Sequence, residues 1–238
     1  DGNQLFKGLS LEFKEGELTS VVGKSGVGKS TLFSLLSGQL NSDQGSIKLG
    51  NDDLTTLPSN KRPTITMFQQ ESLFPHMTIF ENIRFPLVSK YNKARFHDID
   101  HKYYIQQRLK EVNLEGFEDR YPENLSGGQK QRATLARSLA AKPKIMLLDE
   151  PFSALNEELK QDLNAELIEI IKKHGIIALK ITHDTSEALN FSNKILFLDE
   201  SLQFHFNNDH LDELIAPAAV IDYFQLGIQL NDLQAIQI

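Results

Sequence analysis

Cysteine is absent from the 238 residues of this chain, so no disulfide framework holds its fold together. The fold must therefore rest on packing, and a reducing compartment is compatible with the sequence. Hydrophobic residues make up 40% of the chain and charged residues 24%, which is an ordinary globular balance. A chain of this length and composition has enough apolar material for a buried core, in one large domain or two modest ones.

Long apolar runs are also missing. Runs such as Ile145–Leu148 and Ile195–Leu198 are far shorter than the roughly 20 residues that a helix needs to span a bilayer. The segment Asp1–Gln4 lacks the basic and then apolar residues of a signal peptide. We therefore expect the chain itself to be soluble and, because it does not open with Met, we expect further residues before Asp1.

Positive charge is scarce as well. The chain has 25 Lys and Arg residues against 32 Asp and Glu residues, which gives a formal net charge of -7. Proteins that bind nucleic acid neutralise its phosphates with surface cations, so this balance argues against DNA or RNA. We expect no nucleic acid among the partners.

Three short apolar runs predict parallel strands of a buried sheet. They are continuous rather than alternating, which is typical of strands covered by helices on both faces. Leu18–Val22 runs into a glycine, Ile145–Leu148 ends in two acids, and Ile176–Ile181 ends in Thr-His-Asp. Between the second and third runs, Glu157–Lys173 has the apolar spacing of a helix. This order predicts a β-α-β crossover.

Two further segments complete the expected fold. The alternating apolar residues of Leu5–Phe13 predict an antiparallel strand at an edge of the sheet. Residues 72–142 contain three prolines, an amphipathic stretch at Tyr103–Val112 and a glycine pair that opens another helix. We predict a helical insertion packed on the core rather than an independent domain.

A glycine-rich motif predicts a phosphate-binding loop. Residues 23–31 fit the pattern G-x-x-x-x-G-K-[ST] and lie between a predicted strand and a helix expected from Lys29, the context that this motif requires. Backbone N–H groups of such a loop close around phosphate, and the helix N-terminus adds a favourable dipole. Lys29 would reach the β- and γ-phosphates of ATP, and Ser30 would hold Mg²⁺. The loop residues are Gly23, Lys24, Ser25, Gly26, Val27, Gly28, Lys29, Ser30 and Thr31.

Two acids follow the second apolar run. Asp149 is suited to hold Mg²⁺ directly or through water, and Glu150 to act as the general base for the attacking water. On their own, two acids at this point more often end a strand and cap a helix. Beside a phosphate-binding loop, we favour the catalytic interpretation.

The segment Leu125–Gln129, with sequence LSGGQ, offers a hydroxyl and unobstructed backbone N–H groups at a helix start. Such a start is a second phosphate-binding surface, although alone it is also a simple helix cap. Together with the phosphate-binding loop and the two acids, it resembles the signature of the nucleotide-binding domain of ATP-binding cassette (ABC) proteins. The resemblance covers essentially the whole chain and is most like bacterial importers of small solutes.

The resemblance implies a site shared by two chains. In this family two domains pair head to tail around two ATP molecules, so the signature of one faces the triphosphate bound to the other. Gln69 resembles the glutamine that contributes to Mg²⁺ coordination, and His183 resembles the histidine that contacts the γ-phosphate and helps to position the attacking water. The signature residues are Ser126, Gly127, Gly128 and Gln129.

The resemblance also implies the fold class. It is α/β, a P-loop NTPase core with a mixed, mainly parallel sheet, an antiparallel β edge and a helical subdomain insertion. We expect one nucleotide-binding domain over residues 1–238, with a RecA-like core at 1–71 and 143–200 and the helical signature subdomain at 72–142. We expect residues 201–238 to be a short extension without a full regulatory β-domain, with helical pieces at Leu211–Leu214 and Val220–Phe224.

The segment Ser72–Ile83 resembles the part of importers that receives the coupling helix of a membrane subunit. The resemblance thus implies ATP and Mg²⁺ as cofactors and ATP hydrolysis coupled to solute import. The implied partners are a second nucleotide-binding subunit in a homodimer, transmembrane permease subunits and a solute-binding protein. The chain would lie at the cytoplasmic face of the plasma membrane, held there by the permease.

Two positions depart from the family pattern. Asn156 stands where aspartate usually ends a loop that touches the opposite subunit, which bears on communication between the two sites. The aromatic residue that stacks on adenine would fall at or before Asp1, and Phe6 is poorly spaced to replace it.

Other ABC proteins use the same ATP-hydrolysing domain for different functions. An exporter or lipid-extraction ATPase is the closer alternative, and soluble ABC ATPases of DNA repair and translation are the more distant one. The latter usually carry a long coiled-coil insertion or two cassettes in one chain, and neither is present here. A surface metal pair at His97 and His101 is a further alternative, although no third ligand is evident. The transported solute is not encoded in this chain.

Overall fold

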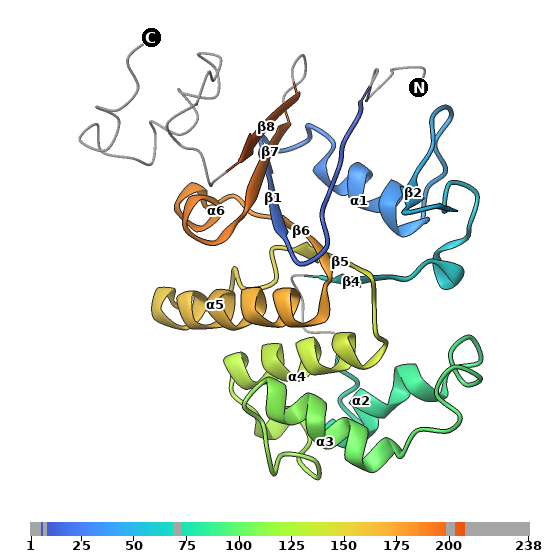
Figure 1. The fold of residues 1–238 in the computed structure, drawn as a ribbon. Coiled ribbons are helices and arrows are strands. Elements are labelled where there is room, and N and C mark those ends of the chain that lie inside the picture. Colours follow the sequence, from blue (N-terminus) through green and yellow to red (C-terminus); the bar gives the residue numbers. More distant parts are fainter. Residues whose placement is uncertain (1–5, 7–8, 69–72, 199–202, 208–238) are drawn as a thin grey trace.

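The computed structural model describes residues 6, 9–68, 73–198 and 203–207, and a six-stranded sheet runs through its centre (Figure 1). The strand order is β4-β5-β6-β1-β7-β8. The first five strands in this order are parallel, and β8 pairs antiparallel with β7. The strands are β1 (Leu18–Gly23), β4 (Thr64–Met67), β5 (Ile145–Asp149), β6 (Ile177–Ile181), β7 (Lys194–Leu198) and β8 (Gln203–Asn207).

Helices connect and cover these strands. The α-helices are α1 (Lys29–Ser37), α2 (Ile79–Val88), α3 (His101–Glu111), α4 (Gly127–Ala140), α5 (Glu157–His174) and α6 (Thr185–Phe191). A small antiparallel hairpin of β2 (Lys48–Leu49) and β3 (Asp52–Asp53) follows α1, and 3₁₀ turns lie at Ser59–Lys61 and Pro122–Asn124.

The sheet separates two apolar cores, because successive side chains on a strand point to opposite faces. On β5, Met146 and Leu148 pack with the buried face of α5 and with α2 to α4. Leu147 points the other way and packs with Leu32 and Phe33 of α1. A continuous apolar run in the sequence therefore serves two cores, as expected for a parallel sheet covered on both sides.

Most sequence predictions of elements are confirmed. The three apolar runs form the neighbouring parallel strands β1, β5 and β6, and the crossover helix is α5. The helices expected in the glycine-rich, amphipathic and signature segments are α1, α3 and α4. Strand β6 begins one residue later than predicted, because the N–H of Ile176 still donates to the Ile171 carbonyl at the end of α5.

The antiparallel strand predicted at Leu5–Phe13 is wrong for the described part of that segment, which carries no strand. Its alternation has another cause, because Phe6, Leu9, Leu11 and Phe13 pack against the core on the α1 face of the sheet. The antiparallel edge of the sheet is instead β8. The helical pieces predicted after residue 210 lie outside the described residues.

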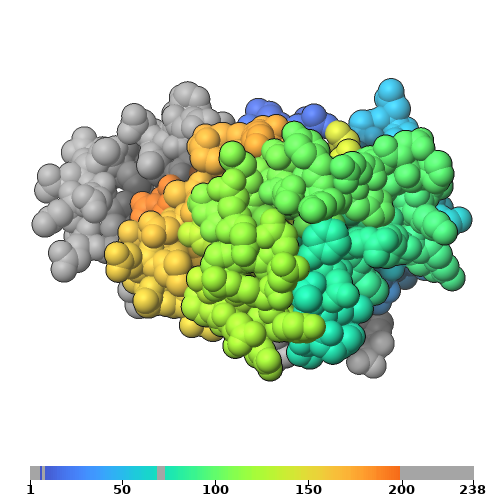
Figure 2. All heavy atoms as spheres, turned by 90° about the horizontal axis from the view of Figure 1, so that it is seen from below, coloured from blue at the N-terminus to red at the C-terminus, as the bar shows by residue number. Residues whose placement is uncertain are grey.

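Helices α2, α3 and α4 lie together below α5 in Figure 1. Seen from below, these helices and their connections, in teal to yellow-green, make up most of the surface (Figure 2). Their shared interior includes Ile79, Ile83, Ile105, Leu109 and Ala136, all buried and continuous with the core beneath the sheet. Within the described residues, no helix combines the length and apolar character needed to cross a membrane.

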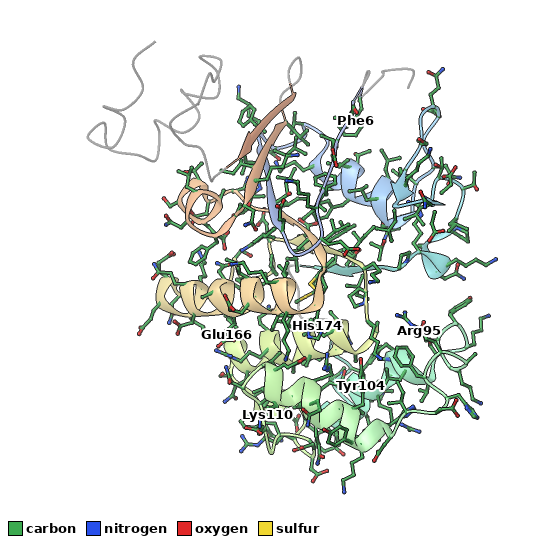
Figure 3. The ribbon with its side chains drawn as sticks, viewed as in Figure 1. Phe6, Arg95, Tyr104, Lys110, Glu166 and His174 are labelled. Carbon is green, nitrogen blue, oxygen red and sulfur yellow. The ribbon has the colours of Figure 1, made fainter. Side chains whose placement is uncertain are left out.

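Ion pairs join this helical layer to α5, in the region where Figure 3 labels Glu166 and His174. Arg132 of α4 pairs with Glu166 of α5. At the end of α5, Lys173 and His174 lie 2.6 and 3.3 Å from the carboxylate of Glu111 on α3. Polar links on one side of α5 thus supplement the apolar core on the other.

The turn before α2 is built on one buried amide. Asn82 is fully buried, and its Oδ1 accepts the N–H of Phe74 at 2.7 Å. Its Nδ2 donates to the carbonyls of Phe74, Met77 and Thr78 at 2.9 to 3.1 Å. Thr78 and Glu81 add a capping box at the start of the helix. The Phe74 segment is therefore fixed by Asn82.

We predict that Asn82→Leu lowers the free energy of unfolding by about 2–3 kcal/mol, because several buried backbone groups lose their partner. The measurement is equilibrium unfolding in urea. Asn92→Leu is the matched control, since the Asn92 amide donates to a single carbonyl, that of Pro86 at 3.1 Å, and should cost less than about 1 kcal/mol. Equal losses in the two variants would contradict the assigned role of Asn82.

Candidate nucleotide-binding site

The loop between β1 and α1 has a backbone that needs glycine. The φ angles of Gly23, Gly26 and Gly28 are 150°, 82° and 108°, and residues other than glycine rarely adopt such values. A Cβ on Gly23 would also lie 2.3 Å from the carbonyl oxygen of Leu198 at the end of β7. The loop is therefore pressed against the sheet edge, while Lys24 and Ser25 at its tip are exposed.

Lys29 points back into this loop. Its side chain is buried, and its ammonium donates to the carbonyls of Gly23 and Lys24 at 2.6 and 2.9 Å. Burial lowers the pKa of Lys29, and the nearby carboxylates of Glu150 and Asp149 act in the opposite direction. The loop thus holds a cation at its centre, and helix α1 begins there with its free N–H groups.

Asp149, the last residue of β5, and Glu150, which follows it, lie near this cation. Burial raises the pKa of Asp149, the charge of Glu150 raises it further, and His183 and Lys29 oppose the shift. Glu150 has a φ angle of 47°, unusual for a residue with a side chain. Its N–H donates to the Ile181 carbonyl at 3.2 Å, and its own carbonyl accepts the Ser153 hydroxyl at 3.1 Å. Backbone contacts on both sides therefore maintain this conformation.

His183 lies within reach of Glu150. The Nε2 of His183 is 2.7 Å from Oε1 of Glu150, and the histidine side chain is 54% exposed. Because β5 and β6 are parallel neighbours, the residues that follow Asp149 and Ile181 meet at the same edge of the sheet. The structure thus brings together Lys29, Asp149, Glu150 and His183 at the phosphate-binding loop.

The signature segment forms the start of α4. Ser126 and Gln129 make a reciprocal capping box, with the Gln129 N–H donating to the serine hydroxyl at 3.3 Å and the Ser126 N–H to the glutamine side chain at 3.0 Å. Ser126 and Gly127 are exposed. Gly128 is buried, and a Cβ there would lie 2.6 Å from a methyl group of Leu159 on α5. A side chain at position 128 would therefore displace Leu159 within the same chain.

Not every predicted site residue joins this cluster. The signature belongs to α4 in the helical layer, whereas the phosphate-binding loop leads into α1 on the other face of the sheet (Figure 1). Gln69 lies outside the described residues. Asn156 is the N-cap of α5, where its Oδ1 accepts the Leu159 N–H at 3.0 Å. The amide thus performs the capping that an aspartate would perform there.

The side chains of His97 and His101 make only local contacts in the described structure. Nδ1 of His97 lies 2.5 Å from the carboxylate of Asp98, and Nε2 of His101 lies 3.2 Å from the Phe96 carbonyl. Over the described ranges, no three His, Asp or Glu side chains come together as possible ligands of a metal ion.

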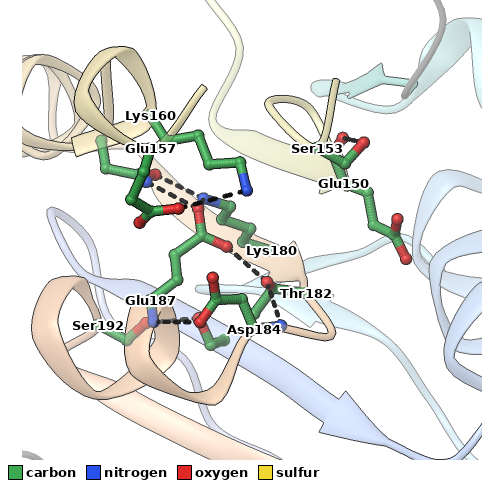
Figure 4. Close-up of polar contacts among 11 residues, drawn as sticks. Glu150, Ser153, Glu157, Lys160, Lys180, Thr182, Asp184, Glu187 and Ser192 are labelled. Carbon is green, nitrogen blue, oxygen red and sulfur yellow. Dashed lines mark hydrogen bonds and ion pairs between the residues drawn. The ribbon is translucent and has the colours of Figure 1, made fainter. Parts of the chain in front are cut away.

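The sequence analysis missed a buried polar cluster next to His183. Lys180, Thr182, Asn164 and Glu187 are linked by hydrogen bonds (Figure 4). A signal was present, because a lysine interrupts the otherwise apolar run of β6. A buried lysine needs a partner, and sequence spacing alone does not reveal which acid supplies it.

Residues 6–153 match the model of a protein family described as ABC transporter. The chain belongs to the ABC transporter family. The match includes the phosphate-binding loop, the signature and the two acids at the end of β5.

Two relatives of this ABC family member illustrate its similarity to named proteins. It is 42% identical over 200 residues to the spermidine/putrescine import ATP-binding protein PotA of Mesoplasma florum, covering 84% of this chain and 56% of that protein. It is 37% identical over 214 residues to the sulfate/thiosulfate import ATP-binding protein CysA of Xanthomonas campestris pv. campestris, covering 90% and 60%. The chain thus spans less than two thirds of the length of these relatives.

Solved structures of the family share the fold. The ADP conformation of MJ1267, an ATP-binding cassette of an ABC transporter, aligns with a TM-score of 0.79 and 23% identity over 94% of this chain and 93% of that one. A nucleotide-free ATP-binding cassette from an ABC transporter aligns with a TM-score of 0.78 and 22% identity, covering 94% of both chains. The predicted fold class, an α/β P-loop NTPase core, is confirmed.

We predict that Asp149→Asn stabilises the nucleotide-free protein. A carboxyl whose pKa is raised by folding binds more protons in the native than in the unfolded state, so wild-type stability falls as pH rises from about 4 through the folded pKa. The amide is free of this loss, and the melting temperature of the variant should exceed that of wild type by a few degrees at pH 8, with the difference shrinking toward pH 4.

The measurement is the thermal unfolding of wild type and of Asp149→Asn at pH values from about 4 to 8. Asp162→Asn is the control, because Asp162 is exposed on α5 and its replacement should leave the melting temperature unchanged. Identical melting temperatures of wild type and Asp149→Asn at pH 8 would remove the basis for this prediction.

Proposed function

We propose that this chain is the ATP-binding and ATP-hydrolysing subunit of an ABC importer of small solutes. The observation that carries the proposal is the convergence of Lys29, Asp149, Glu150 and His183 on one glycine-rich loop. The names of the relatives support the import direction. They do not favour the alternatives of an exporter, a lipid-extraction ATPase or a soluble ABC ATPase.

In this proposal, residues 23–31 bind the triphosphate through backbone N–H groups and through Lys29. The Ser30 hydroxyl, the Asp149 carboxylate and the Gln69 amide would hold Mg²⁺, and oxygen donors of this kind suit that ion. The raised pKa of Asp149 fits this role, because a carboxylate kept in an unfavourable environment gains from a nearby cation. When bound, Mg²⁺ supplies neutralisation of the phosphate charge.

Glu150 is the proposed general base. Water attacks the γ-phosphorus, the bond to the oxygen that bridges the β- and γ-phosphates breaks, and the water proton moves to the Glu150 carboxylate. His183, 2.7 Å from that carboxylate, would contact the γ-phosphate and help to position the attacking water. The His183 side chain is 54% exposed, which leaves it accessible for contact with the γ-phosphate.

The exposed start of α4 supports a composite site. In a head-to-tail homodimer, the Ser126 hydroxyl and the N–H groups of Gly127 and Gly128 would bind the γ-phosphate held by the other chain, with Gln129 supporting Ser126 through the capping box. ATP would close the pair, and hydrolysis would loosen it, so that chemistry gates a conformational change. The division into a core at 1–71 and 143–200, a helical subdomain at 72–142 and an extension at 201–238 is part of this proposal.

A pocket of about 390 Å³ between β4 and the helical layer supports a permease partner. The rings of Phe74 and Phe85 lie 4.8 Å apart in its wall, and Phe85 and Tyr91 are 45% and 55% exposed. A groove with exposed aromatic rings in an otherwise largely polar wall suits a short amphipathic helix of a membrane subunit. The chain would then lie at the cytoplasmic face of the plasma membrane, and a solute-binding protein would complete the importer.

We predict that Glu150→Gln leaves ATP affinity within about twofold of wild type but slows hydrolysis roughly 10²- to 10⁴-fold, since the glutamine accepts no proton. The variant should also accumulate as an ATP-bound dimer. Phosphate release and size-exclusion chromatography with ATP are the two measurements. Glu158→Gln, at an exposed position of α5, should behave as wild type. Wild-type hydrolysis by Glu150→Gln would refute the assigned base.

We predict that Ser126→Arg abolishes hydrolysis while the isolated chain still binds nucleotide, because the altered surface serves the site of the partner. Fluorescence titration with a nucleotide analogue at low protein concentration gives the binding constant, and phosphate release at high concentration gives the activity. Gln106→Arg adds the same side chain at an exposed position of α3 and should retain both properties. Loss of nucleotide binding by the dilute variant would count against a composite site.

A further inference from the structure

A buried charge lies next to the proposed catalytic residues. Lys180 on β6 is only 2% exposed, and an unpaired ammonium at such a position would be very unfavourable. Its Nζ lies 2.5 Å from Oδ1 of Asn164 on α5 and 2.5 Å from Oε1 of Glu187 on α6. It also lies 5.0 Å from the ring centroid of Phe152. Lys180 therefore contacts three separate segments around the end of β6.

Glu187 carries the network to the histidine loop (Figure 4). Its Oε1 also accepts a hydrogen bond from Nδ2 of Asn164 at 2.7 Å, and its Oε2 accepts one from the Thr182 hydroxyl at 2.5 Å. Burial acts to raise the pKa of Glu187, but the charge of Lys180 and the three hydrogen bonds outweigh it and leave the pKa below its ordinary value. The carboxylate is therefore charged and fully engaged.

Both neighbours of His183 are held by this network. Thr182 donates to Glu187 and accepts the N–H of Asp184 at 3.1 Å. Asp184 in turn accepts the N–H of Glu187 at 3.0 Å, as the N-cap of α6. His183 lies between two fixed residues, and its own side chain points out of the network to Glu150.

Glu150, the other residue in the contact with His183, is linked to the buried pair through Phe152. This residue follows Glu150 by two positions, is buried, and lies against the Lys180 ammonium. The Lys180–Glu187 pair therefore touches both loops whose side chains meet in the contact between His183 and Glu150. In Figure 4, Glu150 points away from the buried cluster, so the pair acts on it through the backbone and not by direct contact.

Stability alone does not account for this arrangement, because an apolar pair of similar size is often as stable as a buried ion pair or more so. Charged hydrogen bonds do fix direction and distance more closely than apolar contacts do. We propose that the Lys180–Glu187 pair, with Asn164 and Thr182, is a positioning device that holds the His183 loop in register with Glu150. The inference deepens the proposed ATPase function and rests on it.

The test neutralises both charges while keeping hydrogen bonds available. In Lys180→Met/Glu187→Gln, the new glutamine can still accept from Thr182 and donate to Asn164, so the double variant is expected to fold. We expect its kcat to fall roughly 10- to 100-fold while the KM for ATP stays within about twofold, because misplacement of a catalytic group affects the chemical step. Arg132→Met/Glu166→Gln is the control, since it removes another partly buried ion pair, between α4 and α5, and should leave kcat unchanged.

A cycle with His183→Ala separates positioning from general damage. In the wild-type background, this substitution should lower kcat strongly, whereas in the double-variant background it should have little further effect. An equal factor in the two backgrounds would overturn the proposal. Should the double variant fail to fold, Thr182→Val replaces it, because this change leaves the Lys180–Glu187 pair in place and removes the hydroxyl that donates to Glu187 and accepts the Asp184 N–H.

NMR signals of the His183 ring do not depend on ATP hydrolysis, so they test the positioning role separately from the proposed function. In the wild-type background, Glu150→Gln should shift the NMR signals of the His183 ring, because the two side chains are in contact. In Lys180→Met/Glu187→Gln, the same substitution should no longer shift them, and a full shift would refute the positioning role. Loss of the shift together with an inactive wild-type chain would instead support positioning and refute the proposed ATPase function.

Discussion

The parallel pairing of β5 with β6 is the constraint on which the candidate site depends. Asp149 pairs with Ile181, so the next residues of each strand, Glu150 and Thr182-His183, emerge together at the same edge. Strand β1 pairs on the other side of β6, with Val21 opposite Ile181, and delivers the glycine-rich loop to the same place. A slip of either pairing by one residue would exchange the two apolar cores and separate the reactive groups at once.

The site carries several local costs that the rest of the fold offsets. Lys29 is an ammonium enclosed by carbonyls, Asp149 is a carboxylate that burial disfavours, and Glu150 has an unusual backbone conformation. Each is held by neighbours that are themselves fixed in the sheet or its two cores. Costs of this kind concentrate where a protein binds and transforms ligands, and they persist because the surrounding packing leaves no better arrangement.

Sequence reasoning gave the local features of this site more reliably than its long-range contacts. The pattern of residues 23–31 and the acids after Leu148 sufficed to anticipate the loop and strand ends, because each is a local requirement of glycine geometry or strand periodicity. The strand expected at 5–13 was wrong. Alternation of apolar and polar residues indicates that one face of a segment is buried, but it does not show that the backbone pairs with another strand. The network of Lys180 was missed because its partners, Asn164 and Glu187, come from two other helices, and no spacing rule connects them.

The contact between Gly128 and Leu159 has a mechanical consequence. The leucine occupies the space beside the glycine where any other residue would have its side chain, so the first turns of α4 and α5 interlock. Because the atoms nearest to Gly128 belong to the end of the Leu159 side chain, a small displacement of the start of α5, where Asn156 caps the helix, is met first by rotation of this leucine, and only a larger one moves the start of α4. The two helix starts, distant from each other in the sequence, are therefore coupled through one side chain, and the rotamer of Leu159 sets how closely their movements follow each other.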